Sequence, residues 1–179
     1  MGLLEVYCDA SVSPAVMESP TSSKVTAQFT GRIAILIPEK DFGYIESSTS
    51  DAVTSKGNPA STQMEILAVK RAKEVCEQQR FEDYVILTDN LSAFEQSGVR
   101  EAQWLEQGRI HLASLFLARI MSRAGYLRQS SRKVVKRAKT NRLQEEILRM
   151  FSAEKLQFKL SDSMLWHKIQ MEMEAVQAE

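Results

Sequence analysis

Four acidic side chains stand at the boundaries of predicted strands and helices, where their types and spacing could bind metal ions. Asp9 follows the apolar run LLEVYC, and Asp89 follows a second apolar run, YVIL. Glu65 falls in the first turn of a predicted helix, and Glu145 in a later one. Carboxylates held close together repel one another, so they are stable only with cations or with raised pKa values. Hard divalent cations prefer oxygen ligands, and these acids therefore predict a divalent metal site if folding brings them together.

Asp89 also has a simpler interpretation. The stretch DYVILTDN, residues 83–90, has the composition of a buried strand that ends in polar groups. In an α/β sheet, such strand ends open onto the crevice where ligands bind. Asp89 or Asn90 could instead cap the next helix, because both residue types are favoured at helix N-termini. Each acid taken singly is also typical of a solvated surface charge, so these residues alone leave both roles open.

The elements that must position these acids alternate between strand and helix patterns. A helix is predicted from Ser61 or Thr62 to about residue 79, with Thr62 and Glu65 forming a capping box. The other expected strands are at 3–8, 31–38, 42–48, 84–87 and 133–137, with loops at 12–23 and 49–60. The other expected helices are at 91–96, at 100–124 with a break near Gly108 and a stop at Gly125, at 142–151 with Asn141 as cap, and from Ser161 to about 177. Residues 156–160 alternate as an edge strand does, and a helix there is the competing prediction.

This order of elements predicts an α/β fold with a mixed sheet. The first strand should meet the following hairpin in antiparallel fashion, whereas the later strands arrive through helices and should add in parallel. If the first and fourth strands are neighbours, Asp9 and Asp89 lie side by side, and Glu65 can lean over them from a helix packed on the sheet. Two divalent ions held there could activate water on one side of a phosphodiester and stabilise the leaving oxygen on the other.

The charge of the chain is zero in total but unevenly distributed. Residues 1–106 carry 9 Lys/Arg and 16 Asp/Glu, residues 107–144 carry 10 and none, and residues 145–179 carry 4 and 7. Such a basic block without a single acid favours contact with the phosphates of a nucleic acid over an ordinary solvated face. The members expected to border the acidic site are Arg128, Arg132, Lys133, Lys136, Arg137, Lys139 and Arg142.

The cysteines and the N-terminus indicate a soluble, cytoplasmic protein. Cys8 and Cys76 have neither the number nor the spacing of a disulfide framework or a metal site, and small buried side chains are expected. The N-terminal residues lack the basic start and the apolar run of a signal peptide. No segment approaches the roughly 20 apolar residues of a membrane helix, so no membrane partner is expected. A chain of 179 residues suits one domain with an appendage.

Three short motifs resemble those of the ribonuclease H family. They are YCDAS at 7–11, QMEILAVKRA at 63–72 and ILTDN at 86–90. In order and in predicted element they are similar to the family's strand–Asp–Gly–Ser, helical M-E-L-x-A and strand–Thr–Asp–Ser motifs. The resemblance implies a ribonuclease H-like fold, a five-stranded mixed sheet flanked by helices, over residues 1–151. Residues 152–179 would form a C-terminal extension whose amphipathic helix could pack on the core, pair with a second copy or dock a protein partner.

The resemblance also implies an activity, the hydrolysis of the RNA strand of an RNA–DNA hybrid by an endoribonuclease. Asp9, Glu65 and Asp89 would bind two Mg²⁺ ions, or Mn²⁺ in their place. The family's fourth carboxylate is an Asp early in the last core helix, and the run VKRAKTNRLQEEIL places Glu145 there, with Glu146 as a competitor. The implied catalytic and metal-binding residues are therefore Asp9, Glu65, Asp89 and Glu145.

Polar residues near these motifs are expected to contact the hybrid through groove shape, phosphates and 2′-hydroxyls. They are Ser11, Gln63, Asn90, Lys136, Arg137, Lys139 and Asn141. Trp104 and Trp166 could stack on bases but are more typical of a core, and His111 and His167 are expected to be partly exposed structural residues within helices.

The chain also departs from the family pattern. Ala10 stands in place of the family's Gly, and Ser61 and Thr62 stand where Asn residues often contact the duplex. Two other functions stay open: a nuclease of the same fold that acts on DNA, and a non-catalytic nucleic-acid-binding or protein-interaction module with a degenerate metal site. Fold alone does not decide among them.

Overall fold

The computed structural model describes residues 2–14, 28–51, 60–106, 108–133 and 141–177. The strands are β1 (Leu4–Pro14), β2 (Gln28–Ile37), β3 (Phe42–Asp51), β4 (Tyr84–Thr88), β5 (Ala102–Trp104) and β6 (Lys155–Lys159). The helices are α1 (Ala60–Gln78), α2 (Leu91–Gln96), α3 (Leu112–Lys133), α4 (Arg142–Ser152) and α5 (Met164–Gln177), with 3₁₀ turns η1 (Pro38–Lys40) and η2 (Leu160–Asp162).

The strands form one mixed sheet in the order β5-β4-β1-β2-β3-β6. Strands β1, β2, β3 and β6 pair in antiparallel fashion, whereas β4 and β5 continue the sheet in parallel on the other side of β1. The α/β class, the hairpin and the neighbouring positions of the first and fourth strands are therefore confirmed. The described part of the sheet has six strands, one more than the five-stranded sheet that the resemblance implies, because the edge strand of the C-terminal extension joins it.

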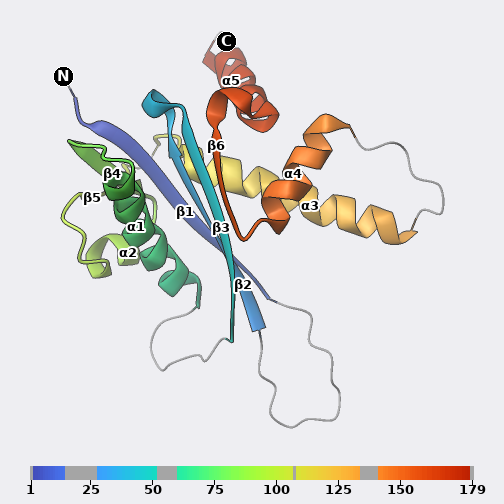
Figure 1. The fold of residues 1–179 in the computed structure, drawn as a ribbon, viewed down its shortest axis with the longest axis horizontal. Helices are drawn as coiled ribbons and strands as arrows, with labels where there is room; N and C mark the ends of the chain where they lie inside the picture. Colours follow the sequence, from blue (N-terminus) through green and yellow to red (C-terminus); the bar gives the residue numbers. More distant parts are fainter. Residues whose placement is uncertain (1, 15–27, 52–59, 107, 134–140, 178–179) are drawn as a thin grey trace.

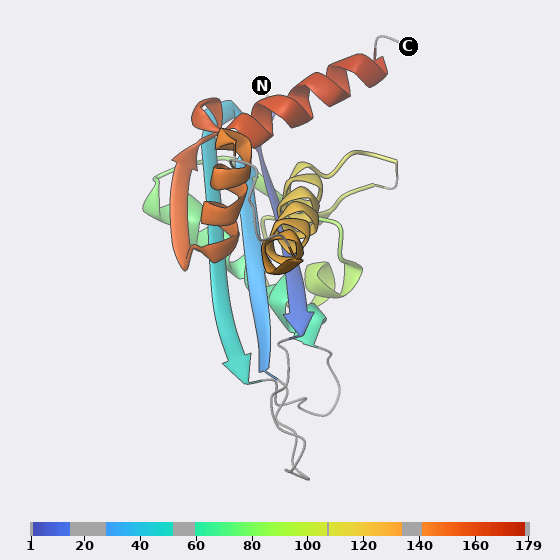
Figure 2. The same cartoon turned by 90° about the vertical axis from the view of Figure 1, so that its right-hand side faces the viewer.

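Helices cover both faces of the sheet. Figure 1 shows α1 and α2 on one side and α3 and α4 on the other, and Figure 2 views the same layers from the side of α3 and α4. Alternate residues of β1 point to opposite faces. Val6 and Cys8 pack in the cluster beneath α1, while Tyr7 belongs to the cluster beneath α3. Burial on both faces explains why the strands read as continuous apolar runs.

The fifth strand is not where the sequence pattern placed it. Lys133, the first residue of the strand predicted at 133–137, is the last residue of α3, and residues 134–137 lie outside the described residues. Strand β5 instead lies at Ala102–Trp104, within a region predicted to be helical. Three residues are too few to show a strand period, and the pairing of Ile86 with Ala102 and of Thr88 with Trp104 decides their conformation.

Several predicted helix ends also shift. Helix α3 passes through Gly125, because a single glycine costs only about 1 kcal/mol within a long helix. Helix α1 begins at Ala60, so the predicted capping box at Thr62 is wrong. Ser163, not Ser161, caps α5, since its Oγ accepts a hydrogen bond from the Trp166 amide at 3.1 Å.

Other boundaries agree or extend further. Helix α2 and the Asn141 cap of α4 are confirmed. Strand β1 runs on to Pro14 and β3 to Asp51, and the remainder of the two predicted loops, 15–23 and 52–59, lies outside the described residues.

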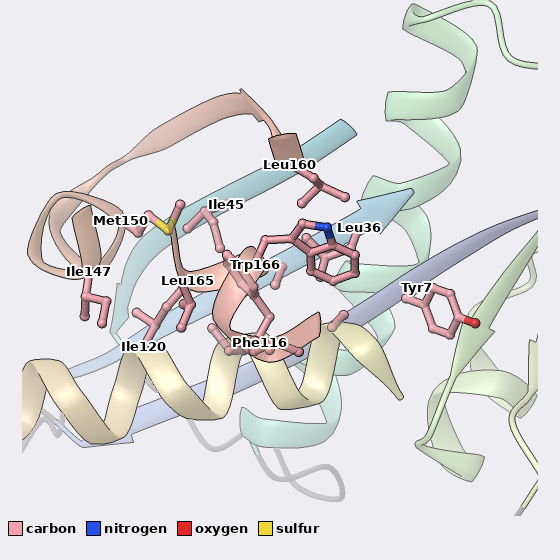
Figure 3. Packing of buried hydrophobic residues seen from close by; sticks show 14 of the residues in the cluster. Tyr7, Leu36, Ile45, Phe116, Ile120, Ile147, Met150, Leu160, Leu165 and Trp166 are labelled. Atoms are coloured by element: carbon pink, nitrogen blue, oxygen red, sulfur yellow. The ribbon is translucent and has the colours of Figure 1, made fainter. Parts of the chain in front are cut away.

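The C-terminal segment shares the sheet and the core of the residues before it. Strand β6 is the predicted edge strand and pairs with β3. Figure 3 shows Leu165 and Trp166 of α5 packed near Phe116 and Ile120 of α3 and Ile147 of α4. Within the described ranges, no helix is long and apolar enough to cross a membrane.

This packing predicts that α5 contributes to global stability. Trp166 is only 6% exposed, so Trp166→Ala should lower the free energy of unfolding by about 3–5 kcal/mol in a urea titration. The control Met171→Ala, on the same helix at 69% exposure, should change it by less than about 0.5 kcal/mol. Equal stabilities for the two variants would mean that α5 is not part of the folding unit.

Candidate metal centre

Asp9 and Asp89 meet where β1 and β4 separate. The parallel ladder between these strands ends with the pair Tyr7 and Leu87. Asp9 and Asp89 each follow two residues later, so the register that pairs Tyr7 with Leu87 places them opposite each other. Strand β1 continues alongside β2 to Pro14, while the chain after β4 turns into α2. The predicted side-by-side arrangement of the two aspartates is therefore confirmed.

Glu65 reaches these aspartates from α1. Ala68 and Val69, three and four residues later, are fully buried against the sheet. Glu65 lies on the same face of the helix, so its side chain points toward the strands. One carboxylate oxygen from each of Asp9, Glu65 and Asp89 lies within 4.8 Å of the other two, and exposure increases from Asp9 through Glu65 to Asp89.

The raised pKa values of Asp9 and Glu65 show that these carboxylates lack a positive partner among the described residues. Burial, and then repulsion from the Asp9 carboxylate, raise the pKa of Glu65 to about 9. Burial, and then the Asp89 charge, raise the pKa of Asp9 to about 6. The buried Oε2 of Glu65 accepts no hydrogen bond from the part of the chain that the structure describes. Clustered carboxylates with a buried, unsatisfied oxygen fit a hard divalent cation, because the ion supplies the missing partner and favours their ionised forms.

Two residues of this centre were missed by the sequence reasoning. Ser114, in the first turn of α3, donates a hydrogen bond from its Oγ to Asp89 Oδ2 at 2.7 Å. His111, just before α3, is 7% exposed rather than partly exposed within a helix. Its imidazole contacts the end of β4 through Leu87. The signal that could have identified them is an N-cap residue followed three residues later by a polar group, at the helix that enters beside a strand end.

The structure does not bring Glu145 into the acidic group, which corrects the predicted fourth ligand. Glu145 is exposed in the first turn of α4. The start of α4 lies beside Arg123, because both line one cavity. Arg123 follows Ser114 by nine residues, or about 13 Å along α3. The competitor Glu146 is buried and caps α5 instead, accepting hydrogen bonds from the amides of Met164 at 3.0 Å and Leu165 at 2.9 Å.

The predicted substrate-binding residues have mixed outcomes. Asn90, not Asp89, caps α2, since its Oδ1 accepts a hydrogen bond from the Ala93 amide at 2.8 Å. Asn141 caps α4 through the Gln144 amide. Ser11 lies in β1 beyond Asp9, and Gln63 is exposed near the start of α1. Lys136, Arg137 and Lys139 lie outside the described residues.

The two tryptophans differ in their exposure to solvent. Trp166 is buried, whereas Trp104 is 43% exposed and pairs with Thr88, the residue before Asp89. An exposed indole thus lies on the strand next to the acidic group.

The described part of the basic block is partly neutralised. Arg119 forms a two-pronged ion pair with Glu172 at 2.6 and 3.0 Å, and Arg109 pairs with Glu5 at 3.3 Å. Arg123 instead lines a cavity between α3, α4 and α5. The cavity is lined by Arg123, Asn141, Leu143, Gln144, Ile147 and Lys168. Two cations and two amides there could bind a phosphate group.

Comparison with known proteins finds no family model that matches this chain, no similar curated protein and no similar solved structure.

The raised pKa of Glu65 predicts how the stability of the metal-free protein depends on pH. In the unfolded chain this carboxyl ionises near its ordinary pKa of 4.5, whereas in the native protein it keeps its proton until about pH 9. The native state therefore binds more protons between these values, and stability should fall as pH rises, by up to about 1.4 kcal/mol per pH unit. Urea titrations in chelator from pH 7 to 9, above the pKa of about 6 of Asp9, measure this slope.

Glu65→Gln removes the titrating group and should flatten the slope, while the exposed control Glu145→Gln should leave it unchanged. A slope that is equally steep in Glu65→Gln would contradict the burial and repulsion assigned to Glu65.

Proposed function

We propose that this protein is a metal-dependent endoribonuclease of the ribonuclease H type that hydrolyses the RNA strand of RNA–DNA hybrids. The observation that carries the proposal is the meeting of Asp9, Glu65 and Asp89, one from each of the three motifs, with ligand oxygens within 4.8 Å. Asp9 and Glu65 are 56 residues apart in the sequence, and Glu65 and Asp89 are 24 apart, so their convergence is not a product of local sequence.

A ribonuclease H-like fold is part of this proposal. Three antiparallel strands, a helix, and two further strands added in parallel beside β1 agree with the expectation drawn from the motifs. Strand β6 and helix α5 extend that arrangement at its other edge.

The three carboxylates would hold the divalent cations. Two bound Mg²⁺ or Mn²⁺ ions would supply an activated water and stabilise the leaving oxygen of the phosphodiester. Asp9 and Glu65, the more buried members, would provide negative charge that water screens poorly, and Glu65 would lose its proton on cation binding. Asp89 is exposed, so it lies on the side from which a nucleic-acid strand can approach.

Two surfaces could hold the substrate. Trp104 exposes its indole on the strand beside Asp89, and base stacking on such a ring contributes about 1–3 kcal/mol per base. The cavity with Arg123 and Lys168 could bind a phosphate further along the strand, with the salt dependence typical of such contacts.

One observation favours a second candidate, a module that binds nucleic acid and metal without cutting. The first turn of α3, the helix that follows the fifth strand, carries Ser114 and no acidic residue. The fourth carboxylate implied by the resemblance, an acid early in the last core helix, therefore has no counterpart there. A three-carboxylate centre can bind a cation and still fail to activate water.

Cleavage of labelled substrates tests the proposal. The protein should cut the RNA of a hybrid in Mg²⁺ and not in chelator. Asp9→Asn and Asp89→Asn should each lower the rate by at least about 10²-fold while hybrid binding is retained, because the charge that holds the cation is lost. Cutting of DNA substrates instead would indicate the DNA nuclease, and hybrid binding by the wild type without any cutting would indicate the non-catalytic module.

Glu145→Gln gives a separate test of the number of carboxylates. Because Glu145 is exposed on α4 and lies outside the acidic group, its variant should keep the wild-type rate within about threefold. A rate as low as that of Asp9→Asn would restore Glu145 as a ligand.

A further inference from the structure

The pairing of β4 with β1 does not fix the position of the Asp89 side chain. Asp89 lies beyond Thr88, the last residue of β4, and beyond the last pair of the β1–β4 ladder. It is also the most exposed of the three acids. Its Oδ2 accepts a hydrogen bond from Ser114 Oγ at 2.7 Å, which restricts rotation of the carboxylate and fixes the direction of the other oxygen.

Ser114 is itself held by His111. The Ser114 amide donates a hydrogen bond to His111 Nδ1 at 3.0 Å. Nδ1 therefore carries no proton in this arrangement, and the neutral ring has its hydrogen on Nε2, which donates to the Leu87 carbonyl oxygen at 2.9 Å. The His111 imidazole is buried, and the Tyr7 ring packs nearly perpendicular to it, with 5.5 Å between the ring centroids.

These contacts form a closed chain of hydrogen bonds that begins in β4 and ends just after it. It runs from the Leu87 carbonyl to the His111 imidazole, on to the amide and hydroxyl of Ser114, and back to the Asp89 carboxylate. This chain of hydrogen bonds ties the first turn of α3 to the end of β4. Any movement of α3 relative to the sheet would therefore move Asp89 relative to Asp9 and Glu65.

A neutral hydrogen-bond donor beside Asp89 suits a metal centre better than a cationic side chain would. Ser114 is a neutral donor, so it orients the Asp89 carboxylate and leaves its full charge for a cation. Among the described residues, no Lys or Arg forms an ion pair with Asp9, Glu65 or Asp89. A lysine in the place of Ser114 would compete with the metal for the same oxygen.

We infer that Ser114, held by His111, is a positioning residue that orients Asp89 for metal binding. The inference rests on the proposed function in that the same three carboxylates are taken to bind the cation.

Binding of Mn²⁺ to the metal-stripped protein, followed by the electron paramagnetic resonance of free Mn²⁺, tests this without any substrate. Ser114→Ala should weaken the affinity about 10-fold, the usual effect of removing a hydrogen bond to a metal ligand, with the melting temperature of the metal-free protein unchanged. Ser114→Thr keeps the hydroxyl and should restore affinity to within about twofold of the wild type. Ser122→Ala, an exposed serine on the same helix, is the matched control and should bind as the wild type does.

Unchanged Mn²⁺ affinity in Ser114→Ala would overturn the positioning role and leave the proposed function standing. Weaker binding in Ser114→Ala but not in Ser114→Thr, in a protein that cuts no nucleic acid, would support the positioning role and contradict the nuclease. A wild-type protein that binds no Mn²⁺ would overturn both.

If the protein is a nuclease, the Mg²⁺ concentration for half-maximal cleavage should also rise about 10-fold in Ser114→Ala, while the rate at saturating Mg²⁺ stays near that of the wild type.

Discussion

Repulsion between three carboxylates is the constraint around which this fold is arranged. Asp9, Glu65 and Asp89 come together where water screens their charges poorly, and the raised pKa values of Asp9 and Glu65 reflect that cost. A protein gains no stability from such a cluster unless something positive occupies it. This raised energy would favour the binding of a divalent cation, so in the proposed function both the stability and the activity of the protein would depend on cation binding.

The three carboxylates are held in place by strands and helices that the sheet pairing and the hydrophobic core already fix. The β1–β4 ladder sets the register of the two aspartates, and buried packing of α1 on the sheet aims Glu65 at them. Helix α3 adds the hydrogen bonds of His111 and Ser114 around Asp89. Strand β6 and helix α5 lie at the opposite edge and enlarge the core beneath α3 and α4, so their contribution is to the position of α3 rather than to the chemistry.

Much of this arrangement could be predicted from the residues. The runs at 3–8 and 84–87 are apolar because both faces of the sheet are covered. The first and third motifs bring Asp9 and Asp89 to the point where β1 and β4 separate, as predicted. The fourth acid was misplaced for a topological reason. A three-residue strand such as Ala102–Trp104 has no period to detect, so the sequence pattern places the fifth strand at KVVKR and the fourth acid in the helix after it, which is α4. With β5 at Ala102–Trp104, the helix that follows the fifth strand is α3. The contacts of His111 and Ser114 with Leu87 and Asp89 span 24 and 25 residues, so no local pattern predicts them.

The most direct test of the account is anomalous scattering from a crystal soaked in Mn²⁺. The account predicts a Mn²⁺ peak bound by oxygens of Asp9, Glu65 and Asp89, with Ser114 still hydrogen-bonded to Asp89 and no oxygen contributed by Glu145. The absence of Mn²⁺ between these three carboxylates, in crystals that bind it elsewhere, would contradict the central claim that their convergence is a metal centre.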